Sequence, residues 1–239
     1  MGESDTTEPQ GPTVSVIMIV KNGERFIAQA LESIFQSKIR PEEILVIDGG
    51  SEDRTIAIAR TFPLVSIIRQ TSTGISNAYN EGIDRAKGAL VAFLSHDDQW
   101  KPGKLDIQVA FMAQNPGMLG TVGMVQHALV PGAKIPPGFR QDMLGCPFPG
   151  MIMEALVARK AIFDAVGRFD PLFSVASDTD WFARARDAGV QIAVLPEVLL
   201  VKRVHETNAS LTEPKLSHQL IRVMRNSVMR KRAMRVLSS

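Results

Sequence analysis

The sequence is poor in several features that would assign a protein to a class at once. It has one cysteine, Cys146, in 239 residues, which excludes an internal disulfide framework and indicates a reducing compartment. No apolar run approaches the roughly 20 residues that a membrane-spanning helix needs. Residues 1–13 are polar and contain no apolar signal core, so we expect a disordered leader there and a cytoplasmic protein.

Net charge is also small, and it is unevenly distributed. The chain has 27 basic and 25 acidic residues, a formal charge of +2. Seven of the basic residues and no acids lie from Lys215 onward, which leaves 20 basic against 25 acidic residues before it, a net of −5. A mildly acidic body with a basic tail is not a nucleic-acid-binding composition. We expect residues 213–239 to form a separate basic helix or tail.

Apolar runs alternate with helix-period segments in the first half of the chain. The runs at 14–20, 42–48, 64–69 and 89–94 predict strands, and their near-continuous hydrophobicity is typical of parallel strands covered on both faces. Segments 24–37, 52–62 and 75–87 predict helices. This alternation predicts an α/β fold with a mostly parallel central sheet flanked by helices, in one compact domain of two intimate lobes.

The second half is less regular. We expect a helix over 102–114, a strand and short helix within 150–167, a helix over 177–189 and strand-like stretches on either side of Pro196. Residues 120–141 have scattered glycine and proline and no clear period. We divide the chain into a first half over residues 14–101 and a second half over residues 102–212.

Acidic residues stand where the predicted strands end. Asp48 follows the second strand, and Asp97 and Asp98 follow the fourth, at the sheet edge where such folds bind ligands. A further pair, Asp178 and Asp180, begins a predicted helix. No glycine-rich phosphate loop follows the first strand, so Mg²⁺ or Mn²⁺ held by carboxylates is the natural means of holding a phosphate-bearing ligand. The alternative for Asp97 and Asp98 is a turn leading into a helix.

Six motifs in order resemble those of the family-2 nucleotide-sugar glycosyltransferases, which have an A-type α/β fold. The resemblance covers residues 14–210 and rests on SVIMIVKNGERFIAQALESIFQS, VIDGGSEDRT, GISNAYNEGIDRAKG, FLSHDDQW, FSVASDTDWFARARDAG and RVHETNAS. It implies that residues 14–101 bind the donor nucleotide and that residues 102–212 carry the acceptor site and the catalytic base. It also implies a divalent cation, Mn²⁺ or Mg²⁺, as cofactor.

The resemblance implies roles for individual residues on the donor side. Asp48 would accept a hydrogen bond from the nucleotide base, with a turn acid as the alternative, and the main chain from Ile19 to Lys21 would line the same pocket. Asn77 and Asn80 would lie near the sugar or phosphates, or else cap and pack a helix. Ser95 stands where many relatives have the first acid of the metal motif; it can bind a ribose hydroxyl but removes one negative charge.

Further residues are implied for the metal and the phosphates. Asp97 and Asp98 match the last two acids of the metal motif, and Asp97 also belongs to the nucleotide site. His205 matches a histidine that completes the metal shell or touches the diphosphate in some relatives, and Arg203 is the candidate for a phosphate contact. The alternatives are a packed histidine and a solvated arginine.

The catalytic base is assigned to Asp178, with Asp180 as the second candidate. Inverting sugar transfer needs a base beside the acceptor hydroxyl. Counting back from Arg184 in the family pattern places Asp178 on the base position. Asp180 has a structural alternative, because Ser177 and Asp180 have capping-box spacing and Asp180 can pair with Arg184 one turn later.

We therefore expect a metal-dependent inverting glycosyltransferase that moves a sugar from a nucleotide-diphosphate sugar to a saccharide or lipid-linked acceptor, in cell-surface polysaccharide or glycoconjugate synthesis. The alternatives are a catalytically impaired nucleotide-sugar-binding relative and a sugar-phosphate nucleotidyltransferase. In the tail, Leu216, Leu220, Val223, Met224 and Ser227 predict one apolar helix face, which fades after Val228. This helix docks on the acidic body or makes peripheral contact with the inner face of a membrane.

Overall fold

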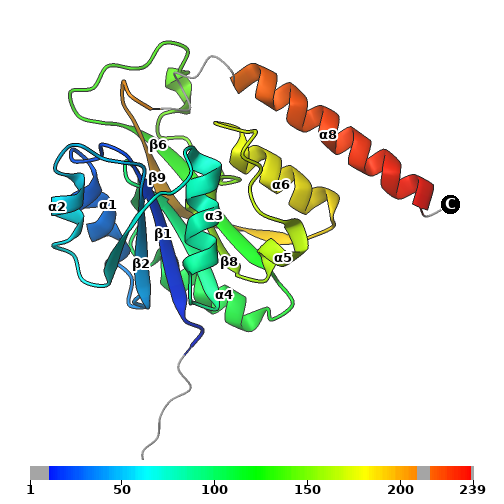
Figure 1. Ribbon diagram of the computed structural model, residues 1–239, viewed down its shortest axis with the longest axis horizontal. Helices are drawn as coiled ribbons and strands as arrows, with labels where there is room; N and C mark the ends of the chain where they lie inside the picture. The colour runs from blue at the N-terminus through cyan, green and yellow to red at the C-terminus, as the bar shows by residue number, and fades with distance from the viewer. Residues whose placement is uncertain (1–10, 209–215, 238–239) are drawn as a thin grey trace, which may run out of the picture.

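A computed structural model describes residues 11–208 and 216–237. Its first half contains β1 (Val14–Val20), α1 (Ile27–Ile34), β2 (Glu43–Asp48), α2 (Thr55–Ala59), β3 (Val65–Arg69), α3 (Ile75–Arg85), β4 (Leu90–Ser95) and β5 (Gln99–Trp100). Its second half contains α4 (Lys104–Gln114), β6 (Gly120–Leu129), η1 (Gln141–Met143), β7 (Phe148–Pro149), η2 (Met153–Ala155), β8 (Leu156–Arg159), α5 (Ile162–Val166), α6 (Ser177–Asp187), β9 (Ile192–Val204) and α8 (Leu216–Leu237). Figure 1 shows how these elements are arranged.

The strands form one mixed sheet in the order β3-β2-β1-β4-β8-β6-β9-β5, with β7 paired to β6. The longer pairings, of β1 with β2 and β4, of β2 with β3 and of β6 with β9, are parallel. The shorter ones, made by β5, β7 and β8, are antiparallel. The predicted α/β fold with a mostly parallel sheet flanked by helices is confirmed.

Helix α3 lies over one face of the sheet, alongside β1, as Figure 1 shows. The contact depends on Gly82, because a Cβ at that position would lie 2.4 Å from Cγ2 of Ile17 in β1. Ile17 is fully buried, so it cannot move aside. One turn earlier on α3, Tyr79 is held against the carboxyl end of the sheet and reaches the cavity described below.

Strand β9 differs from the expectation of two stretches on either side of Pro196. It runs without interruption over 13 residues, and Pro196 falls where the pairing with β6 shifts register. Its partner β6 was not predicted, because residues 120–129 mix glycine and polar residues with apolar ones. The far end of β9 pairs with β5, matching Gln99 to Val201, and this places the segment after β4 beside residues 202–204.

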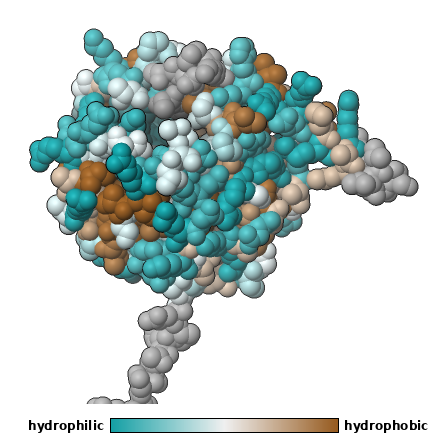
Figure 2. All heavy atoms as spheres, viewed as in Figure 1, coloured by the Kyte–Doolittle hydropathy of each residue, from teal (hydrophilic) through white to brown (hydrophobic). Residues whose placement is uncertain are grey.

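The C-terminal helix α8 packs against α6 and extends beyond it, as Figure 1 shows. Its docked face includes Val223 and Ser227, with exposed fractions of 4% and 5%. Met224, which we expected on that same face, is instead 69% exposed. Figure 2 shows hydrophilic and hydrophobic residues side by side along this arm. Among the described helices, none combines the length and apolar character needed to cross a membrane.

Candidate active site

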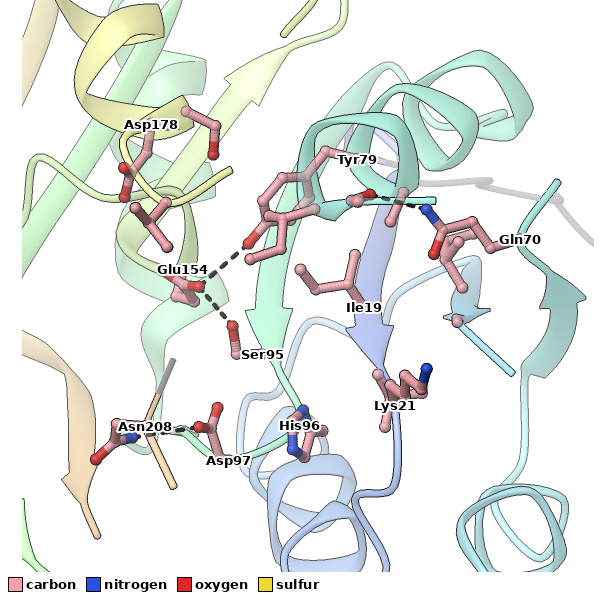
Figure 3. A pocket seen from close by; sticks show the side chains of 18 of the residues that line it. Ile19, Lys21, Gln70, Tyr79, Ser95, His96, Asp97, Glu154, Asp178 and Asn208 are labelled. Atoms are coloured by element: carbon pink, nitrogen blue, oxygen red, sulfur yellow. Dashed lines mark hydrogen bonds between the residues drawn. The ribbon is translucent and has the colours of Figure 1, made fainter. Parts of the chain in front are cut away.

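A cavity of about 1090 Å³ opens at the carboxyl ends of β1 and β4. Figure 3 shows that residues from distant segments meet around it. We call the end near Ile19, Lys21 and Gln70 the β1 side, and the end near Glu154 and Asp178 the α6 side; His96 and Asp97 lie below and between them in this view.

The loops that follow β1 and β2 are tied to each other at the rim of the β1 side. The Asn22 amide donates to Oγ of Ser51 at 2.9 Å, and the Gly23 amide donates to Oγ1 of Thr55 at 2.7 Å. Gly23 also has to be glycine, because a Cβ there would lie 2.5 Å from the ring of His96. These two amides are therefore used inside the protein and are not directed at a phosphate.

Asp48 lies at the end of β2 and is buried, with an exposed fraction of 7%. Its carboxylate accepts the Ser51 amide, at 3.1 Å to Oδ1 and 3.3 Å to Oδ2. Its neighbours Ile47 and Gly49 line the cavity, whereas Asp48 itself does not. Asp48 therefore makes the contacts of an acid that stabilises a turn, which was the alternative interpretation. Its contact with a nucleotide base stays a prediction. Ile19 and Lys21 do line the cavity.

Asn77 and Asn80 do not line the cavity, although their helix α3 passes beside it. Nδ2 of Asn77 donates to the carbonyl of Thr73 at 2.7 Å. Asn80 exchanges two hydrogen bonds of 2.9 Å with the main chain of Phe169, one in each direction. Both asparagines therefore make the capping and packing contacts that we considered as alternatives.

Asp97 faces the cavity at the end of β4, where the segment after β9 meets it. Its Oδ2 lies 3.3 Å from Nε2 of His205 and 3.4 Å from Nδ2 of Asn208. Burial by itself would raise the pKa of Asp97, but the hydrogen bond to His205 and the charge of Lys202 hold it well below the usual range. Asp97 is thus ionised at neutral pH, and it lies beside His205, whose imidazole is also a common metal ligand.

Asp98, which we expected to bind metal, points away from the cavity into the protein. Its side chain is fully buried; Oδ2 lies 3.0 Å from Nζ of Lys202, and Oδ1 accepts the amide of Arg203 at 3.0 Å. The two carboxylates diverge within the turn between β4 and β5, where the amide of Asp98 donates to the carbonyl of Ser95 at 3.3 Å. This geometry leaves Asp97, and not Asp98, available to a ligand.

Arg203 also differs from expectation. Its guanidinium donates to Oε1 of Gln29 at 2.6 Å and to main-chain oxygens of Phe26 and Asp97, and it lies over the Phe26 ring at 4.7 Å. It does not line the cavity; the preceding Lys202 does. Carboxylates around Lys202 outweigh its burial and raise its pKa above the usual range. Lys202 is therefore one of three lysine and arginine side chains that line the cavity, with Lys21 and Arg25.

The base candidates are also separated by the structure. Asp178, in the first turn of α6, lines the α6 side of the cavity and accepts the Thr179 amide at 2.8 Å. Burial, and next the negative charge of Glu154, raise its pKa to about 6. Asp180 is 2% exposed and pairs with Nε of Arg184 at 2.8 Å, away from the cavity. The geometry therefore favours Asp178 as a base and gives Asp180 the structural role.

Glu154 is a cavity residue that the sequence analysis missed. It lies on η2 and is 7% exposed. Its Oε1 accepts hydrogen bonds from Oγ of Ser95 at 2.5 Å and from the hydroxyl of Tyr79 at 3.1 Å, as Figure 3 shows. A signal was present in the sequence: Glu154 is a single acid within the otherwise apolar run GMIMEALVA.

No complete metal cluster exists within residues 11–208 and 216–237, where no three histidine, cysteine, aspartate or glutamate side chains converge. Asp97 and His205 form a pair only. A pair is nevertheless what a substrate-linked Mg²⁺ or Mn²⁺ uses, because such an ion takes few protein ligands and completes its shell with phosphate oxygens and water.

Comparison with known proteins gives a consistent family and fold. The sequence profile of glycosyl transferase family 2 matches residues 15–137. An uncharacterized glycosyltransferase of Rickettsia typhi is 27% identical over 84% of this chain and 68% of its own length. TuaG of Bacillus subtilis, a candidate teichuronic acid biosynthesis glycosyltransferase, is 31% identical over 43% of each chain.

The fold is similar to that of S. aureus TarS, residues 1–349, solved in complex with UDP-GlcNAc. The TM-score is 0.71 at 20% sequence identity, and the match covers 91% of this chain and 66% of that one. The chain thus spans about two thirds of the length of this solved structure.

Proposed function

The chain belongs to glycosyl transferase family 2, and from this membership and the cavity we propose that it transfers a sugar from a nucleoside diphosphate sugar to an acceptor hydroxyl, inverting the anomeric carbon. The observation that carries the proposal is the position of Asp178 at one end of a cavity of about 1090 Å³, which is large enough for a nucleotide sugar. TarS, which has the same fold, binds UDP-GlcNAc.

The donor would lie along the cavity with its nucleotide base at the β1 side. There Ile19 offers an apolar wall, and the carboxylate of Asp48 would accept a base N–H if its turn contacts to Ser51 were exchanged. The diphosphate would lie near Asp97 and Lys202, and the sugar would point toward Asp178 on the α6 side. This order puts the bond to be broken between the cation of Lys202 and the carboxylate of Asp178.

Asp97 and His205 would hold the divalent cation, Mn²⁺ or Mg²⁺. Their oxygen and nitrogen lie 3.3 Å apart, and both residues line the cavity. When bound, the ion would neutralise the negative charge that develops on the departing diphosphate. Because Ser95 stands where an acid would be, Asp97 and His205 are the two candidate metal ligands that we assign among the described residues.

Transfer would follow a single displacement. The acceptor oxygen forms a bond to the anomeric carbon from the face opposite the diphosphate, while the bond from that carbon to the diphosphate oxygen breaks. Asp178 takes the hydroxyl proton, and the nucleoside diphosphate leaves with the electron pair. The raised pKa of Asp178, about 6, makes it a stronger base than an ordinary carboxylate and leaves it ionised at neutral pH.

The acceptor we propose is a saccharide or a lipid-linked saccharide used in cell-surface polysaccharide or glycoconjugate synthesis. The support is the relative TuaG, whose name refers to teichuronic acid biosynthesis. A lipid-linked acceptor would require the protein to work at a membrane surface, and helix α8 is the element that would bind that surface.

Helix α8 carries a second face beside the one that docks on α6. Ile221, Met224 and Val228 follow helical spacing and are 64%, 69% and 51% exposed. Arg225 and Lys231 flank this stripe and are exposed. A short apolar stripe between basic side chains is complementary to an anionic lipid surface, and we propose that surface as its partner.

The nucleotidyltransferase alternative loses support, because the amides after β1 are bonded to Ser51 and Thr55 and do not form a phosphate cradle. The experiment for the proposal is incubation of the protein and Mn²⁺ with UDP-glucose, UDP-N-acetylglucosamine and GDP-mannose, followed by measurement of released nucleoside diphosphate. Slow release from one donor supports an active transferase, and tight binding without release supports the impaired relative. Absence of both binding and release would overturn the proposal.

A further inference from the structure

Ser95 leaves the motif at the end of β4 with one acid fewer than the family pattern it resembles. A serine hydroxyl can bind a sugar or ribose hydroxyl, but it brings no negative charge to the cavity. A carboxylate nevertheless stands at this point, because Oγ of Ser95 donates to Oε1 of Glu154 at 2.5 Å. The charge missing at position 95 is thus present, and it comes from η2, 59 residues later in the chain.

The contacts of Glu154 differ from those of a structural acid. The buried carboxylates of Asp98, Asp180 and Asp187 each pair with a lysine or arginine, and that of Asp48 accepts a main-chain amide. Glu154, 7% exposed, forms no such ion pair among the described residues, and both of its hydrogen bonds come from neutral hydroxyls to a single oxygen, Oε1. Burying a carboxylate without a cation is costly, so its retention in a cavity wall points to a ligand.

The position of Glu154 identifies which part of a donor it meets. Figure 3 shows it on the α6 side with Asp178, far from Lys21 and Gln70 on the β1 side. The two carboxylates also act on each other, since the charge of Glu154 contributes to the raised pKa of Asp178. If the donor's base lies at the β1 side, its sugar lies beside Glu154.

We propose that Glu154 holds a hydroxyl group of the sugar being transferred, in the place that an acid at position 95 would otherwise occupy. This inference rests on the proposed function, because it requires a nucleotide sugar in the cavity. A carboxylate accepts hydrogen bonds from two hydroxyls at once, and Oε2 accepts none from the described residues. Glu154 is therefore a positioning and specificity residue, which disfavours donors that lack the matching hydroxyl.

The test compares binding of UDP with binding of UDP-sugars by titration calorimetry, for wild type and Glu154→Gln. If UDP-glucose and UDP-N-acetylglucosamine both bind the wild type, the tighter one is used. Loss of a charged hydrogen bond should weaken the UDP-sugar by about 10- to 100-fold and leave UDP within about twofold of wild type. UDP carries no sugar, so a general distortion of the cavity would weaken both ligands alike.

Two further variants separate a local effect from a structural one. Glu43→Gln is the matched control, because Oε1 of Glu43 accepts Oγ of Ser15 at 2.7 Å at the opposite end of the sheet. It should leave both affinities unchanged. The double variant Ser95→Asp with Glu154→Gln returns the carboxylate to position 95 and should recover most of the lost UDP-sugar affinity.

The possible results are distinguishable. A wild-type protein that binds neither UDP nor any UDP- or GDP-sugar removes the proposed function, and this inference with it. A wild type that binds the UDP-sugar more tightly than UDP, with Glu154→Gln keeping the same difference, removes the role of Glu154 and leaves the proposed function standing. Equal weakening of UDP and UDP-sugar makes Glu154 a structural residue and also overturns the inference.

Discussion

Nε2 of His205 lies 3.3 Å from Oδ2 of Asp97, although the two residues are 108 positions apart in the chain. Their approach depends on the antiparallel pairing of β5 with β9, which sets the segment after β4 against the end of β9. The same pairing places Asp98 against Lys202 on the inner side of that segment. One carboxylate of the pair is thus available to a ligand, and the other is committed to the fold.

The first prediction separates these two acids. Asp97→Asn should remove the Mn²⁺-dependent part of UDP affinity, about 10- to 100-fold, because one of two proposed metal ligands is lost. Asp98→Asn should instead lower the free energy of unfolding by about 3–5 kcal/mol, since it leaves the ammonium of Lys202 without its partner. Calorimetry with and without Mn²⁺, and urea denaturation, measure the two effects. If Asp98→Asn lost the Mn²⁺-dependent affinity and Asp97→Asn lost stability instead, Asp98 would be the metal ligand.

A second prediction concerns pH. A base must be deprotonated to act, and the pKa of Asp178 is about 6, so kcat/KM should rise with pH through about 6 and level above it. Removing the charge of Glu154, the second cause of that raised pKa, should move the midpoint to lower pH. Profiles of wild type and Glu154→Gln test this. A midpoint that is unchanged in the variant would show that Asp178 is not the titrating base.

Asp178→Asn gives the third prediction. It should lower kcat by roughly 10²–10⁴ and leave UDP-sugar affinity near the wild-type value, because the base acts on the acceptor and not on the donor. Steady-state kinetics and calorimetry measure the two quantities on the same preparation. Equal activity of variant and wild type would contradict the assignment.

Asp180→Asn is the matched variant two residues away, and it should behave in the opposite manner. Arg184 pairs with Asp180 and also donates to the carbonyls of Val166 and Arg168, so the loss of this buried carboxylate should cost about 3–5 kcal/mol of folding free energy. Turnover per folded molecule should remain. A fall in turnover with an unchanged thermal midpoint would transfer the base role to Asp180.

The fourth prediction tests the solvent face of α8. The full chain should co-sediment with vesicles containing phosphatidylglycerol at low salt, and less at high salt, because the basic residues contribute about 1 kcal/mol each near an anionic surface. Truncation after Ser217, or glutamine at Ile221, Met224 and Val228, should abolish this. Glutamine at Met151 and Leu172, which are 42% and 63% exposed elsewhere, serves as the control.

Two results would reject that surface as a lipid site. Protein that stays in the supernatant at low salt excludes lipid binding. A concentration-dependent dimer in light scattering that the α8 glutamine variant disrupts would show that the stripe binds a second copy of the chain.

The sequence predicted most of the first half of the fold. The apolar runs became β1 to β4 to within about a residue, because strands buried on both faces have a pattern that depends little on distant contacts. Strand β6 was missed, since its Gly123 is fixed by a distant residue: a Cβ there would lie 2.7 Å from Leu199 in β9. Such a requirement is invisible until the partner strand is known.

For the site, the sequence identified which segments reach the cavity more accurately than which side chains line it. It chose Asp97, Asp178 and His205, which line the cavity, but also Asp98 and Arg203, which do not. The difference between neighbours depends on which way a side chain points, and this is set by pairing with β9. Glu154 was missed although it is a lone acid in an apolar run, because the run does not show that this acid meets Ser95, which lies 59 residues away.

The configuration of the first sugar released distinguishes inverting from retaining transfer. Water can replace the acceptor, so the protein with Mn²⁺ and UDP-N-acetylglucosamine, in which the sugar is α-linked, is followed by proton NMR from the first minutes; UDP-glucose is used if it is the better donor. Inverting transfer with Asp178 as the base predicts that the β anomer forms first and that Asp178→Asn does not form it. Initial release of the α anomer would exclude inversion, and equal release by the variant would exclude Asp178 as the base.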